Sequence, residues 1–140
     1  MAYSAAPSTG RQVRDASTYF QLLDGSSLSS TGDSGWLEKG LVHEATLHVE
    51  LGTCTGTGTS MVLSLLQADD SSGTNPETLA ILATADQDDD DKEAKALVYV
   101  NKPYVKVAYT IAGTTPVFPT TATLRLTHDH RGDNYTGVWS

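Results

Sequence analysis

Apolar and polar residues alternate along several short segments of this chain. The clearest run is 45–51, where Ala45, Leu47, Val49 and Leu51 alternate with Thr46, His48 and Glu50. Residues 103–111 alternate in the same way, with Val105, Val107, Tyr109 and Ile111 on one side. Successive side chains of a β-strand point to opposite faces, so both runs predict strands with one buried and one wetted face.

The remaining strand signals are shorter and are separated by turn residues. We expect strands at 18–23, 35–40, 61–67, 79–84, 96–100 and 122–127, and a last edge strand at 135–140. The segment 79–84 also fits a short helix, but a strand is preferred. The expected breaks are an Asp24-Gly25 turn, a loop at 52–60, a turn at 69–76, an acidic segment at 86–93 and a loop from Ala112 that holds Pro116 and Pro119. About eight short antiparallel strands at this spacing predict an all-β fold, a β-sandwich or jelly roll.

Residues 1–17 show neither periodicity and are rich in Ala, Ser, Pro and Gly, which is typical of an extended N-terminal arm. The expected organisation is therefore an arm at 1–17 and one β-sandwich domain at 18–140. Arg11 and Arg14 against Asp15 give the arm a charge of +2 − 1 = +1, which leaves −8 − 1 = −9 on the rest. This asymmetry indicates an arm that docks on another surface, and a terminus without a role is the alternative.

Charge, apolar content and cysteine usage limit the partners and the cellular compartment that we expect. A net charge of −8 with only nine Lys and Arg argues against nucleic acid, which is bound by clustered basic residues. No apolar run is long enough for a membrane helix, and the first residues lack the apolar stretch of a secretion signal. Cys54 is the only cysteine, so no disulfide can form within the chain, which suits a protein made in a reducing cytoplasm.

The motifs of catalysis and cofactor binding are missing from the sequence. Residues 52–60 are Gly-rich but lack the Lys of a phosphate-binding loop, and there is no Gly-x-Ser-x-Gly elbow. Cys54 lies among Gly and Thr with no basic neighbour, which favours an unpaired thiol over a nucleophile. We therefore expect no enzymatic activity and no cofactor.

Two places carry candidate metal ligands. Asp86, Asp88 and Asp90 occupy the first, third and fifth positions of a calcium loop, but the sixth and twelfth positions hold Asp91 and Leu97 in place of Gly and Glu. A helix-loop-helix site is thus excluded; a looser cation site and a solvated acidic hairpin tip remain, and the hairpin tip is preferred.

The second place follows the last predicted central strand. His128 and His130 would share a face and could hold a metal with Asp133, although structural zinc sites normally have four ligands. Arg131, Gly132 and Asp133 also form the tripeptide that integrins bind, and ordinary turn chemistry explains it better.

Two longer segments carry a family resemblance: 61–73 (MVLSLLQADDSSG) and 104–118 (YVKVAYTIAGTTPVF). The order of a strand, a Gln-x-Asp-Asp turn, a Tyr-Val-Lys-Val strand and a Gly-Thr-Thr-Pro loop resembles small virion proteins of tailed phages. Within that group, residues 45–127 are most similar to capsid decoration (cement) proteins. The acidic segment 86–93 departs from the pattern.

The resemblance implies a virion protein made in the host cytoplasm that binds the major capsid protein on the outer capsid surface. It implies a β-sandwich or jelly roll, often a homotrimer, that sits at capsomer junctions and stabilises the head against internal pressure. The resemblance also implies a terminal arm that reaches neighbouring capsid subunits. We therefore assign the arm to capsid contact, with the residues Tyr3, Arg11, Arg14, Tyr19 and Phe20. A thin sandwich core independently favours an oligomer, because burial between copies would add to its stability.

Two other functions fit an all-β chain. A carbohydrate- or receptor-binding jelly roll would need an aromatic platform, for which Trp36 and Trp139 are the only Trp residues. A tail-tube or head-completion protein would also be β-rich and oligomeric, and ring-shaped hexamers would distinguish it from a trimer.

Overall fold

The computed structural model describes residues 18–39, 43–127 and 139. These residues form nine strands and no helix, and every strand pair is antiparallel. The strands are β1 (Thr18–Leu28), β2 (Gly32–Asp33), β3 (Leu37–Glu38), β4 (His43–Leu51), β5 (Thr55–Ala68), β6 (Glu77–Ile81), β7 (Ala85–Asp86), β8 (Glu93–Val100) and β9 (Tyr104–Thr127). The predicted all-β class is confirmed.

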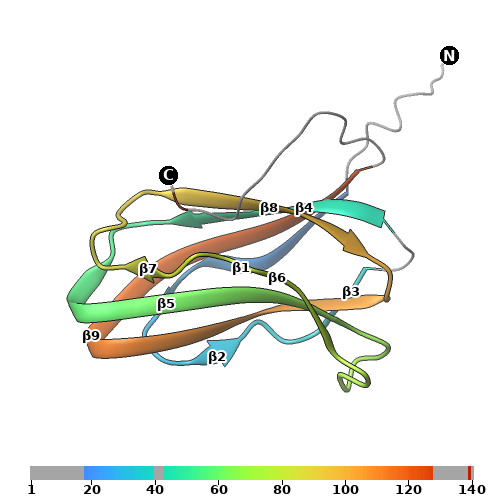
Figure 1. Ribbon diagram of the computed structural model, residues 1–140, viewed down its shortest axis with the longest axis horizontal. Coiled ribbons are helices and arrows are strands. Elements are labelled where there is room, and N and C mark those ends of the chain that lie inside the picture. The colour runs from blue at the N-terminus through green and yellow to red at the C-terminus, as the bar shows by residue number, and fades with distance from the viewer. Residues whose placement is uncertain (1–17, 40–42, 128–138, 140) are drawn as a thin grey trace, which may run out of the picture.

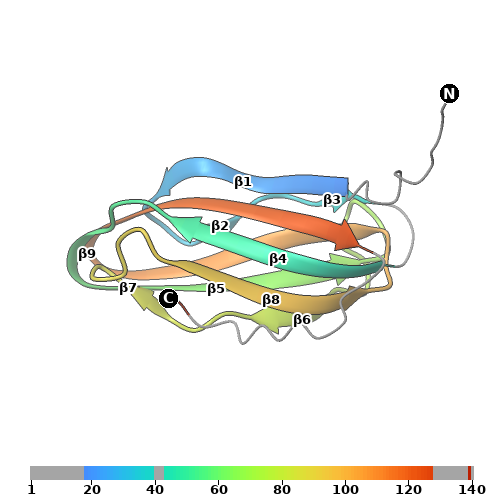
Figure 2. The same ribbon diagram turned by 90° about the horizontal axis from the view of Figure 1, so that it is seen from above.

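The long strand β9 joins two layers. Its first half pairs with β5, β2 and β3, and its second half pairs with β1 and β4. Strands β6 and β7 extend the first layer from β5, and β8 extends the second from β4. Figures 1 and 2 show the long strands running along the length of the molecule, with β9 folding over at one end to return in the other layer. The result is a β-sandwich nearly closed like a barrel.

The corner at which β9 changes layer was misassigned from sequence. The expected loop at 52–60 is correct only for 52–54, because β5 begins at Thr55. The loop expected from Ala112 onward is wrong, because β9 continues to Thr127. The glycines there serve bulges: Gly113 has a φ of 112° and lies so close to β5 that an added Cβ would sit 2.5 Å from Thr59 Cα. The β5–β9 register shifts between Thr55 and Ser60. Such bulges bend strands without ending them.

The expected Asp24-Gly25 turn is wrong for the same reason. Strand β1 continues through it to Leu28, and its register with β9 shifts between Asp24 and Ser26. Gly25, with a φ of 74°, supplies the left-handed conformation that the irregularity requires.

The core lies between the two layers and follows the predicted alternation. On β4, Ala45, Leu47 and Val49 are fully buried, and on β9 Val105 and Val107 are as well. Strand β6 ends at Ile81, so the first half of 79–84 is strand and none of it is helix, which agrees with the preference for a strand. The largest fully buried apolar side chains are those of Phe118, Leu47, Met61, Leu63, Leu65 and Leu124.

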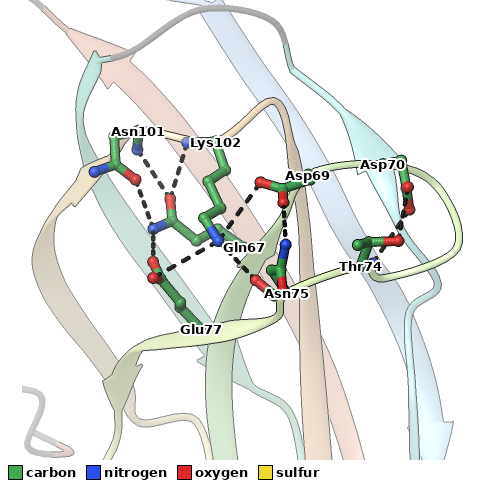
Figure 3. A network of polar contacts seen from close by, with 8 residues as sticks. All are labelled: Gln67, Asp69, Asp70, Thr74, Asn75, Glu77, Asn101 and Lys102. Atoms are coloured by element: carbon green, nitrogen blue, oxygen red, sulfur yellow. Dashed lines mark hydrogen bonds and ion pairs between the residues drawn. The ribbon is translucent and has the colours of Figure 1, made fainter.

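One buried polar side chain braces the end of the sandwich opposite the corner (Figure 3). The Gln67 amide, 2% exposed, donates to Glu77 Oε1 and Asn101 Oδ1, both at 2.7 Å. Its oxygen accepts from the backbone N–H groups of Asn101 at 2.9 Å and Lys102 at 3.1 Å. Lys102 Nζ in turn donates to Asn75 O at 2.7 Å. This network fixes the loop between β5 and β6 to the turn between β8 and β9.

Candidate functional site

The outward surface of the β1–β9–β4–β8 sheet carries most of the large hydrophobic side chains that are exposed among the described residues. Because β4 buries Ala45, Leu47 and Val49, it turns Thr46, His48 and Glu50 outward. We call this surface the outer face; Figure 2 shows its four strands side by side. The other strands contribute Tyr19 and Gln21 from β1, Thr121, Thr123 and Arg125 from β9, and Glu93, Lys95, Leu97 and Tyr99 from β8.

A cross-strand row spans the outer face near the start of β1. Tyr19 pairs with Arg125, Arg125 with Thr46, and Thr46 with Leu97. With about 4.8 Å between neighbouring strands, the row is about 14 Å wide. The Arg125 guanidinium lies 5.5 Å from the centre of the Tyr19 ring, a cation–π arrangement that holds both side chains in place.

Large apolar side chains are exposed around this row. Tyr19 is 61% exposed, Leu97 39% and Tyr99 67%. Tyr99 lies two residues beyond Leu97 on the same face of β8, opposite Glu44 on β4. We call Tyr19, Leu97, Tyr99 and Arg125 the apolar patch. Tyr and Arg are over-represented among the residues that dominate binding energy in protein interfaces.

The other end of the outer face is polar and closely packed. His48 Nε2 lies 2.7 Å from Glu93 Oε1 and 3.7 Å from Glu50 Oε2. Glu50 and Glu93 are direct cross-strand partners, as are His48 and Lys95. We call His48, Glu50 and Glu93 the His48 cluster. It is the one group of three potential metal ligands that converges within the described residues.

The acidic segment does not gather its carboxylates around a point. Asp86 Oδ1 accepts from Asp88 N at 2.8 Å, and Asp89 Oδ2 accepts from Asp86 N at 2.8 Å. Asp90 Oδ1 accepts from Cys54 N at 2.8 Å. Asp86 and Asp89 thus satisfy backbone N–H groups within a tight turn, as Asp and Asn side chains commonly do, and Asp90 joins that turn to the link between β4 and β5. The arrangement fits the hairpin-tip interpretation better than a cation site.

Cys54 has the surroundings of an unreactive thiol. It is buried, and this burial, followed by the nearby carboxylates of Asp90, Asp89, Asp91 and Asp86, raises its pKa to about 11. The thiolate is the nucleophilic form, so these surroundings oppose a catalytic role.

Only part of the predicted capsid-contact set lies in the described residues. Tyr19 is presented on the outer face, whereas Phe20 packs against the core. Tyr3, Arg11 and Arg14 lie outside the described residues, and so do His128, His130, Arg131 and Asp133.

The tryptophans do not form an open platform. Trp36 contacts the 69–76 loop so closely that a Cβ at Gly73 would lie 2.7 Å from its Nε1, and Lys106 Nζ lies 4.7 Å from its ring centre. Trp139 Nε1 donates to Ala83 O at 2.7 Å. Both residues are half-buried.

Sequence reasoning identified the polar face of β4 but missed both groups on the outer face. His48 and Glu50 were visible as neighbours at a spacing of two, but Glu93 joins them only through the β4–β8 register.

No protein-family model matches the chain, and no curated protein proved similar to it.

Proposed function

We propose that this protein is a tailed-phage capsid decoration protein that binds the outer capsid surface at capsomer junctions and stabilises the head against internal pressure. The apolar patch on the outer face is the observation that carries the proposal. The sequence resemblance over residues 45–127 supplies the class of partner, the major capsid protein.

The geometry suits adhesion by a rigid surface. The patch lies on a sheet of four hydrogen-bonded strands, so its side chains lose little freedom on binding beyond their own rotations. Exposed Tyr and Leu side chains supply apolar area, and Arg125 supplies hydrogen-bond donors for a partner carboxylate or carbonyl. Repetition over many equivalent capsid positions makes a modest affinity per contact sufficient when copies are linked in an oligomer.

The arm would add to the same contact. Residues 1–17 directly precede Thr18, the first residue of β1 and the neighbour of Tyr19, so any contact that the arm makes begins beside the patch. An extended arm that adds a strand to a capsid sheet edge would gain affinity from main-chain hydrogen bonds.

A carbohydrate-binding role has less support. It requires aromatic rings that lie open on one surface, and Trp36 and Trp139 are half-buried against backbone and Lys106. Among the described residues, Tyr19 and Tyr99 are the exposed aromatic rings, and they are separated by the β9 and β4 strands.

The test is binding to undecorated heads of the phage that encodes the chain, measured by co-sedimentation. We expect the wild-type protein to bind, and Tyr99→Ser to weaken binding by at least about 30-fold, the size of an interface hot spot of about 2 kcal/mol. Ile81→Ser is the matched control, because Ile81 is 65% exposed but belongs to β6 in the other layer.

Three results would contradict the proposal: no binding by the wild-type protein, equal loss in the Ile81 variant, or selective binding to a glycan array. Undiminished binding after deletion of residues 1–17 would remove only the role of the arm. Light scattering should give a trimer; hexameric rings would favour a tail-tube or head-completion protein.

A further inference from the structure

We propose that the His48 cluster is a binding site for a divalent transition-metal ion of the zinc class. The inference does not depend on the proposed capsid function, because it rests on the ligand set alone. His48, Glu50 and Glu93 each direct one ligand atom into the cluster, and all three atoms lie within 4.8 Å of one another.

The ligand types select the class of ion. One imidazole nitrogen and two carboxylate oxygens suit Zn²⁺ and its neighbours in the first transition row, whereas Ca²⁺ and Mg²⁺ prefer oxygen ligands only. Three protein ligands with further positions open to water is the usual arrangement of a zinc site that is not purely structural.

The distances are close to those of a metal-bound set. In a tetrahedral site with bonds of about 2.1 Å, ligand atoms lie about 3.4 Å apart. His48 Nε2 is 2.7 Å from Glu93 Oε1 and 3.7 Å from Glu50 Oε2, so side-chain rotations that move each atom by less than about 1 Å would admit the ion. The backbone need not move, because β4 and β8 already hold the three residues in register.

The sheet also shows why a cation would stabilise this arrangement. Glu50 and Glu93 face each other directly across β4 and β8, and like charges in such pairs repel. A hydrogen bond from His48 relieves part of the repulsion, and a divalent ion between the carboxylates would relieve more. Thr121 and Thr123, the partners of Glu50 and His48 on β9, add no charge, and Lys95 faces His48 from β8.

The experiment is isothermal titration of ZnCl₂ into the metal-free full-length protein, with thermal unfolding measured alongside. We expect a site for one ion per chain and an unfolding midpoint that rises with ZnCl₂ concentration. His48→Gln and Glu93→Gln should each weaken this site by at least about 100-fold, since even residues that only support a metal ligand are worth 10–100-fold. Glu44→Gln, on the same face of β4 but outside the cluster, should bind as the wild type does.

A second variant separates this site from the other candidate ligands. The double variant His128→Ala/His130→Ala should still bind Zn²⁺ at the His48 cluster. Co²⁺ bound to the wild-type cluster should give a visible absorption spectrum, and His48→Gln should lose that spectrum. The proposal is overturned if the wild-type chain binds no Zn²⁺, if binding survives in His48→Gln, or if only the His128/His130 variant loses it.

Discussion

Replacing Gln67 by Met tests the claim that one buried amide holds together the end of the sandwich. Met has a similar length and fills the same space, but it neither donates nor accepts a comparable hydrogen bond. The substitution removes four hydrogen bonds and leaves the backbone N–H groups of Asn101 and Lys102 without their acceptor.

The expected loss follows from those two N–H groups. An unsatisfied buried polar group costs about 1–3 kcal/mol. Asn101 is exposed and Lys102 half-buried, so water can reach part of this backbone and the lower half of the range applies to each group. Glu77 and Asn101 lose a neutral donor and can turn toward solvent. We therefore expect Gln67→Met to lower the free energy of unfolding by about 2–4 kcal/mol, a large share of a typical 5–15 kcal/mol.

The assay is equilibrium unfolding in guanidinium chloride followed by circular dichroism. At about 3 °C per kcal/mol, the thermal midpoint should also fall by roughly 6–12 °C. Gln21→Met on β1 makes the same chemical change at an exposed position and should stay within about 0.5 kcal/mol of the wild type.

Gln67→Glu then separates hydrogen bonding from packing. The carboxylate can still accept from Asn101 and Lys102, but it cannot donate to Glu77 and it repels that side chain. Burial and repulsion would raise the pKa of the introduced carboxyl group in the folded state. The loss of stability of Gln67→Glu relative to the wild type should therefore be largest at neutral pH and shrink as the pH falls toward 4–5, the ordinary carboxyl range. A Gln67→Met variant within about 0.5 kcal/mol of the wild type would refute the reasoning.

Two further predictions concern Cys54 and Gly73. Because the folded-state pKa of Cys54 is raised to about 11, the thiol of the unfolded chain loses its proton first, so the free energy of unfolding should fall as the pH rises from about 9 toward 11. Chemical unfolding across that pH window checks this prediction, and Cys54→Ala should abolish this part of the pH dependence. Gly73→Ala should cost about 1–3 kcal/mol, since Gly73 has a φ of 79° and an added Cβ would lie 2.7 Å from Trp36 Nε1. Gly35 has a similar positive φ of 82°, but a Cβ added there would have no atom within 4 Å, so Gly35→Ala is the control. Thermal unfolding of the two variants therefore isolates the Trp36 contact. Equal losses of stability would show that this contact adds nothing.

Periodicity predicted the strands whose one face is buried and whose other face is wet. Residues 45–51 and 103–111 are such segments, because Leu47 and Val107 must reach the core while His48 and Lys106 remain outside it. The prediction failed where Gly and Pro were taken as the ends of strands. At the β5–β9 corner, Gly56 and Gly113 permit bulges and close approach within continuous strands, and local sequence does not distinguish a bulge from a loop.

The candidate sites were predictable only to the extent that they are local. The acidic segment and Cys54 could be assessed from their neighbours, and their surroundings in the structure favour the expected hairpin tip and unreactive thiol. The His48 cluster could not be found this way, because His48 and Glu93 are 45 residues apart and meet only through strand register. The apolar patch likewise needs Tyr19, Arg125 and Leu97 to be brought together from three strands.

The buried side of the same sheet is what keeps these outward groups in place. Leu47 faces Leu124, and Val49 faces Ala122, in pairs that alternate along β4 and β9 with His48–Thr123 and Glu50–Thr121. A slip of one residue would turn Leu47 and Val49 outward and the polar residues into the core, so the core packing excludes it. Since β9 also pairs with β5 across the corner, its position is fixed from both layers. Substitutions that preserve the core pairs should therefore leave the outer face intact, and the outer face is free to change in chemistry without changing the fold.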